Sequence, residues 1–104
     1  MTHADVLRLV LYVTGDTTRS AAAIANLQEI QKLLNGQCEI TVIDVLEHPE
    51  LAEREKILAT PTLVKVSPPP LRRLIGDLSD QALVVSLLDL GGGFTVPKQS
   101  IQRF

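Results

Sequence analysis

The segment from Lys56 to Ser79 carries four of the six prolines of this chain, and it constrains the possible folds more than any other part. Each proline fixes its own φ and removes a backbone donor, so regular structure must fit between the prolines. Two runs of strand length, Thr62–Val66 and Leu71–Ile75, flank the prolines at 68–70, and Gly76 ends the second run. This pattern predicts an antiparallel pair of strands joined by a stiff loop.

Pro61 stands directly ahead of the first of these strands, in the triplet Thr60-Pro61-Thr62. The bond before a proline prefers trans only slightly, so tertiary contacts can select cis at modest cost. We expect that selection to matter at Pro61, because the residue opens a strand.

The N-terminal half reads as a strand, a helix and a second strand. Leu7–Val13 is almost continuously apolar and predicts a central strand that is buried on both faces. Thr17 or Thr18 can cap a helix over residues 19–34, and residues 39–46 predict a second buried strand. The helix is expected to bury Ala23, Leu27, Ile30 and Leu34. Such a unit implies parallel pairing of the two strands.

Two more helices complete the reading. Pro49 opens a short helix, in whose first turn a missing donor does no harm. Its candidate buried positions are Leu51, Ile57 and Leu58. A last helix is expected to begin after an N-cap at Ser79, with Asp80 in its first turn, and to end at Leu90 before three glycines.

Composition excludes several classes of function. A chain of 104 residues makes one domain, and 3% aromatic residues with a net charge of −2 argue against nucleic-acid binding. Cys38 is the single cysteine, so no internal disulfide or CxxC motif exists, and we expect no metal site or cofactor. No signal pattern or membrane span stands out, which makes the cytoplasm the default location.

The element order βαβαββα is that of the thioredoxin-like α/β fold, and Thr60-Pro61 falls where such folds carry a cis-proline. A redox protein of this fold would carry CxxC after the first strand, where this chain has Thr14-Gly15-Asp16-Thr17. No catalytic residue is therefore expected. A thioredoxin-like redox enzyme stays open as an alternative function, as does a sensor-type binding domain of a histidine kinase system.

Three parts of the sequence together resemble the KaiB family of clock proteins. They are LYVTGDT at 11–17, residues 42–80 with their ATPTL, PPP and IGDLS elements, and LDL at 88–90. The resemblance extends over residues 7–90, so we expect a KaiB-like domain over 1–90 and a flexible tail over 91–104.

The resemblance implies a non-enzymatic regulator that binds the N-terminal ATPase ring of KaiC and modulates its phosphorylation and ATPase cycle. It implies a fold switch between a self-associated ground state, a dimer or tetramer of order βαββααβ, and a rare thioredoxin-like monomer that binds KaiC. KaiA or a histidine kinase are further implied partners where they are present.

The resemblance also implies two groups of functional residues. Candidate contacts with KaiC are the basic residues Lys56, Lys65, Arg72 and Arg73, for which a solvated charged surface is the plain alternative. Candidate positions for the fold switch are Pro61, Leu87, Leu88 and Asp89. At Leu87 the family often has glycine. The runs 71–75 and 84–85 suit both helix and strand, which is compatible with such a switch.

Overall fold

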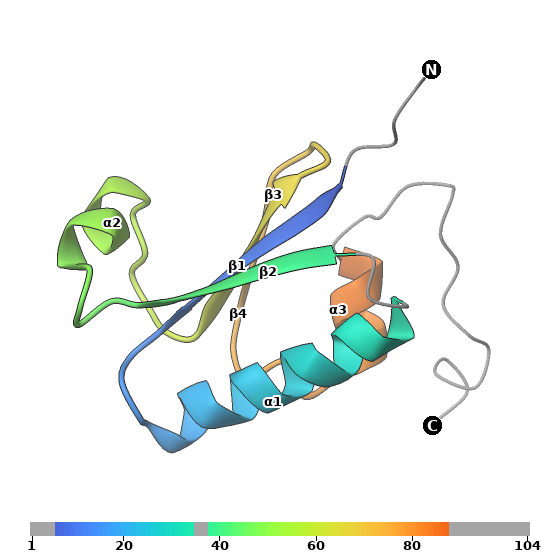
Figure 1. The fold of residues 1–104 in the computed structure, drawn as a ribbon, viewed down its shortest axis with the longest axis horizontal. Helices are drawn as coiled ribbons and strands as arrows, with labels where there is room; N and C mark the ends of the chain where they lie inside the picture. The colour runs from blue at the N-terminus through green and yellow to red at the C-terminus, as the bar shows by residue number, and fades with distance from the viewer. Residues whose placement is uncertain (1–5, 35–37, 88–104) are drawn as a thin grey trace.

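The computed structural model describes residues 6–34 and 38–87, which form a four-stranded sheet with helices (Figure 1). The elements are β1 (Leu7–Val13), α1 (Thr18–Leu33), β2 (Cys38–Asp44), α2 (Pro49–Arg54), β3 (Thr62–Ser67), β4 (Arg72–Ile75) and α3 (Gln81–Leu87). The predicted order βαβαββα is confirmed. The predicted tail over 91–104 lies outside the described residues.

The strands lie side by side in the order β2-β1-β3-β4. β1 pairs in parallel with β2 and antiparallel with β3, and β3 pairs antiparallel with β4. Both the parallel unit and the proline-flanked antiparallel pair were predicted. β1 is central, as expected, and its Leu11 lies opposite Val42 on one side and Leu63 on the other. The C-terminal strands therefore join the N-terminal unit along one ladder, between β1 and β3.

The core lies between one face of this sheet and the helices α1 and α3, which Figure 1 shows on the same side of the sheet. Thr17 caps α1 through its side-chain oxygen, which accepts the amide proton of Ser20 at 3.2 Å. All four predicted positions of α1 are buried: Ala23, Leu27, Ile30 and Leu34. Alternate residues of β1 face them, beginning at Leu7 and Leu9.

Two expectations about burial are wrong. β2 is not a buried strand, because it is an edge strand with a neighbour on one side only, and Val42 is 45% exposed. Leu58 is 94% exposed rather than buried. It follows a helix, α2, that itself buries no side chain. In both places an apolar residue lies beside a short or edge element, which offers too little neighbouring structure to cover it.

The start of α3 also differs from the prediction. Asp80, not Ser79, is the N-cap, since its Oδ1 accepts the amide proton of Leu83 at 3.0 Å and its carbonyl accepts that of Val84. The amide of Ser79 donates instead to Asp77 Oδ1 at 3.1 Å. The local turn around Asp77 thus delays the helix by one residue.

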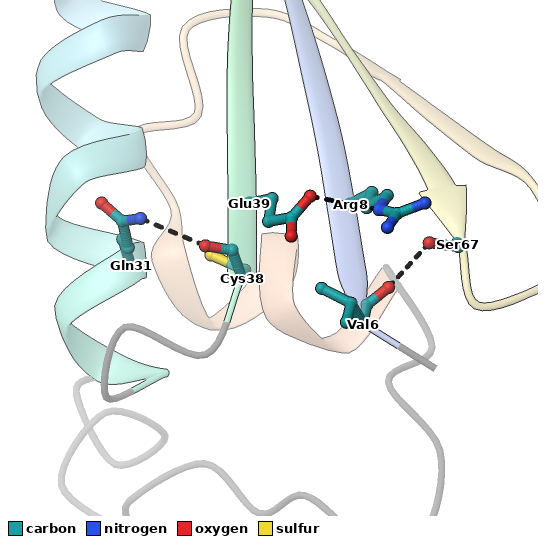
Figure 2. A network of polar contacts seen from close by, with 6 residues as sticks. All are labelled: Val6, Arg8, Gln31, Cys38, Glu39 and Ser67. Atoms are coloured by element: carbon teal, nitrogen blue, oxygen red, sulfur yellow. Dashed lines mark hydrogen bonds and ion pairs between the residues drawn. The ribbon is translucent and has the colours of Figure 1, made fainter. Parts of the chain in front are cut away.

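Three polar contacts hold the end of the sheet at which β1 and β2 begin (Figure 2). Arg8 pairs with Glu39 across β1 and β2 at 3.1 Å, and the Ser67 hydroxyl donates to the Val6 carbonyl at 2.7 Å. The Gln31 amide of α1 donates to the carbonyl of Cys38 at 3.3 Å. Burial raises the pKa of the Cys38 thiol above its ordinary value.

Candidate functional site

The candidate site is built around the C-terminal end of α2. The amide of Lys56 donates to the carbonyl of Glu53 at 3.1 Å, and that of Ile57 donates to the carbonyl of Ala52 at 2.9 Å. These two bonds form a Schellman cap, in which the residue at the position of Lys56 adopts the left-handed conformation. Lys56 has a φ of 57°, at a place where glycine is usual. The cap exposes the Lys56 side chain beyond the end of the helix.

Arg73 of β4 fastens this cap. Its Nη1 donates to the carbonyl of Lys56 at 3.1 Å, and its Nη2 donates to the carbonyl of Glu55. The last carbonyls of a helix have no partner within the helix and carry partial negative charge, so a guanidinium there is favourable. The structure thereby brings together two of the predicted basic residues, but as a backbone contact of one beside the other.

Tyr12 lies close to the same cluster. Burial raises the pKa of the Tyr12 phenol above 10.0, and the nearby Glu55 carboxylate raises it further, while Arg73 and Arg54 lower it. Tyr12 is buried in β1, in agreement with the expectation of strand packing. The charged groups of α2 and β4 therefore lie near the face of the sheet to which Tyr12 belongs.

The other two predicted basic residues lie elsewhere. Lys65 is fully buried, at 0% exposure, opposite Leu9 of β1 and Arg72 of β4 in the strand register. This correction concerns only its position: Lys65 is not on the surface of this conformation. Arg72 is exposed, but successive residues of a strand point to opposite faces, so Arg72 and Arg73 do not face one partner together.

Pro61 occupies the place that the fold predicts. The Thr60-Pro61 bond is cis, the residue is fully buried, and its carbonyl accepts the amide proton of Gly76 at 3.0 Å. The hydroxyls of Thr14 and Thr60 are hydrogen-bonded to each other. The loop after β1, where a redox protein would carry its thiols, thus meets the proline loop through hydroxyl groups.

Asp44 is a residue of this region that the sequence did not single out. Its Oδ1 accepts the amide protons of Gly15 at 3.1 Å and Leu46 at 2.9 Å, which joins the ends of β1 and β2. An acidic residue at the end of a strand, one loop away from a glycine turn, was the available signal. Leu87 is the last described residue of α3, whereas Leu88 and Asp89 lie outside the described residues.

The described residues contain no group of three or more potential metal ligands. Within the same part of the chain, no helix is long and apolar enough to cross a membrane. Cys38 lies at the first position of β2, whereas the loop after β1 lies beyond the other end of that strand. Six residues of a strand separate the two ends by about 20 Å.

Comparisons with known proteins agree on one family. Residues 10–90 match the KaiB domain family. The circadian clock oscillator protein KaiB of Prochlorococcus marinus is 55% identical over 83 residues, which are 79% of this chain and 71% of that protein. The circadian clock protein KaiB3 of Synechocystis is 51% identical over 89 residues, which are 83% of this chain and 87% of that protein.

Solved structures show the same architecture. The N-terminal domain of SasA from Synechococcus elongatus superimposes with a TM-score of 0.70 at 27% identity, over 91% of this chain and 94% of that domain. The thioredoxin of Fasciola hepatica superimposes with a TM-score of 0.69 at 17% identity, over 85% of this chain and 84% of that protein. The thioredoxin-like fold predicted from the order of the elements is therefore confirmed.

Proposed function

The chain belongs to the KaiB family, and from this premise we propose that it is a non-enzymatic clock or timer regulator that binds the N-terminal ATPase ring of KaiC. By binding, it modulates the phosphorylation and ATPase cycle of KaiC. The same proposal places the protein in the cytoplasm together with that ATPase, and it includes KaiA or a histidine kinase as further partners where they are present.

The observation that carries this proposal is the thioredoxin-like arrangement of the described chain, which the SasA domain shares. Two domains of one architecture can present similar surfaces to one partner, whereas a rearranged C-terminal half could not. Identity above 50% with proteins named KaiB, against 27% with SasA, favours a KaiB-like role over a kinase sensor domain.

A redox enzyme is disfavoured by chemistry at the place where this fold performs it. The loop after β1 offers hydroxyl groups, which meet the proline loop at Thr14 and Thr60. The single thiol, at Cys38, is buried at the other end of β2, and its raised pKa keeps it protonated. Disulfide exchange requires an accessible thiolate. An insulin-reduction assay without thiol-dependent activity would dispose of this alternative.

The proposal includes a switch between this fold and a self-associated ground state of order βαββααβ, a dimer or tetramer. Two folds of one sequence can compete when they differ by only a few kcal/mol. Pro61, Leu87, Leu88 and Asp89 are the proposed positions that bias this balance. Support comes from the runs 71–75 and 84–85, which form a strand and part of a helix here but suit either state.

Among the basic residues, Lys56 is the strongest candidate for direct contact with KaiC. Its side chain is exposed, and the backbone keeps a left-handed conformation that lysine adopts only at a cost. A non-glycine residue in such a conformation suggests a role for its side chain. Lys65 is buried, so a direct contact by Lys65 would require a change of conformation.

The test is size-exclusion chromatography with light scattering, on the purified chain alone and after long incubation with KaiC of the same organism and ATP. We expect a dimer or tetramer that slowly enters a ring-sized complex, with one protomer for each ring subunit. A chain that stays unbound over many hours, under several nucleotide and phosphorylation conditions, contradicts the proposal.

A charge reversal locates the contact. Lys56→Glu should slow association with KaiC by about tenfold or more, because charges at the rim of an interface act mainly on the association rate. Lys32→Glu is the matched control, since Lys32 is an exposed lysine of α1 that pairs with Glu29 at 3.0 Å. Equal effects of the two substitutions would show a general effect of charge instead of a contact at Lys56.

A further inference from the structure

We propose that Arg73 is a positioning residue, which fixes the turn after α2 to β4 and thereby sets how Lys56 and Leu58 are presented. In this role its guanidinium serves the backbone of its own chain and is not a free charge for a partner. The part of this inference that concerns binding rests on the proposed function, whereas the part that concerns the turn does not.

The geometry of the contact matches a guanidinium and not merely a positive charge. Two nitrogens of Arg73 reach two successive carbonyls, those of Glu55 and Lys56. A planar fork can donate to both at once, whereas the ammonium group of lysine is a point charge on a flexible stem. The contact also joins segments 17 and 18 residues apart in the sequence, so it is tertiary.

The turn needs such an anchor because little else holds it. α2 has six residues and buries none of them, and an isolated helix of this length is not stable in water. Lys56 adds the cost of its left-handed conformation, and Leu58 projects into solvent two residues later. Without the guanidinium, the partial negative charge at the end of α2 would lose its cationic neighbour.

This arrangement makes the turn depend on β4. Any change that removes β4 from the edge of the sheet also removes Arg73 from α2, so the turn with Lys56 and Leu58 should lose its fixed shape at the same time. Arg73 would thus couple the presentation of these two side chains to the presence of the antiparallel pair β3 and β4.

The first experiment measures hydrogen exchange of the amides of Lys56 and Ile57 in the full-length chain, since both amides are hydrogen-bonded in the cap. Arg73→Ala and Arg73→Lys should each speed this exchange by about tenfold or more relative to the unsubstituted chain. Arg72→Ala, on the other face of β4, should change it less than about twofold.

Three results would overturn the inference. One is exchange in Arg73→Lys as slow as in the unsubstituted chain, which would mean that charge alone suffices. Another is an equal acceleration in Arg72→Ala, which would mean that the whole strand is destabilised. The third is the absence of protection at both amides in the unsubstituted chain.

The second experiment measures binding to the KaiC ring. A positioning role predicts that Arg73→Lys weakens binding as much as Arg73→Ala does, whereas a direct charge contact predicts that lysine preserves it. Arg19→Ala, at an exposed position of α1, serves as the control. If the unsubstituted chain does not bind the ring, the proposed function fails, and the exchange experiment alone decides the role of Arg73.

Discussion

Lys56 shows how one backbone angle separates two roles of a residue. Its φ of 57° suits glycine, so Lys56→Gly should stabilise the chain relative to Lys56→Ala by roughly 1 kcal/mol. Both substitutions remove the same charge, which isolates the contribution of the backbone. Urea denaturation of the two variants measures the difference. Equal stabilities would contradict the left-handed cap.

Tyr12 should make stability depend on pH at the alkaline end. Its pKa in the folded state is raised above 10.0, so its contribution is fully present below pH 10 and is lost as the pH rises through the folded-state pKa. Tyr12→Phe should lack this loss. Since Tyr12 is the single tyrosine, tyrosinate absorbance follows its titration directly. A midpoint at or below the ordinary value would contradict the burial of the phenol.

Residues were predictable where a repeating pattern fixed their environment, and not where a single contact did. The helical spacing of Ala23 and Leu27 predicts their burial, because it depends only on the helix itself. The burial of Lys65 and the exposure of Leu58 depend on which segments pack nearby. The contacts of Arg73 join β4 to α2, and nothing local to either segment announces them.

At the scale of elements, α3 depends on its N-cap. Asp80→Ala should destabilise the chain by about 1 kcal/mol, because it leaves the amide of Leu83 without its acceptor. Ser79→Ala should cost much less, since the Ser79 side chain is exposed and is not the cap. Thermal unfolding of the two variants gives the comparison. A larger loss for Ser79→Ala would restore the cap predicted from the sequence.

The elements themselves were predicted closely, but their surroundings were not. β1 has the predicted bounds, and α1 begins one residue earlier than expected. β2 was expected to be buried because its residues are apolar, yet the strand lies at an edge, with Val42 and Leu46 exposed. Apolar composition favours a strand, but the order of strands in a sheet depends on long-range pairing.

At the scale of the whole molecule, a disulfide can test whether this fold is the one that binds. The hydroxyls of Thr14 and Thr60 meet across 46 residues of sequence, so Thr14→Cys combined with Thr60→Cys should form a bond under oxidation. The oxidised variant should enter the KaiC complex without a slow phase, because its proline loop is held in place. The reduced variant should behave like the unsubstituted chain.

Two controls make this measurement decisive. Thr14→Cys alone tests for pairing with the native Cys38, which is buried at the far end of β2. Failure of the double variant to oxidise would contradict the proximity of the two loops. An oxidised variant that no longer binds KaiC would contradict the thioredoxin-like arrangement as the binding state.

The single ladder between β1 and β3 divides the molecule into two cooperative units. Residues 7–44 close on themselves through β1, α1 and β2, whereas β3, β4 and α3 attach through that ladder and through the core, with a register shift between Arg8 and Leu9. Opening along the ladder costs less than global unfolding, since the first unit keeps its own pairing. The lifetime of the C-terminal arrangement is therefore set by one line of strand pairing and its packing, and it can be shorter than the lifetime of the domain.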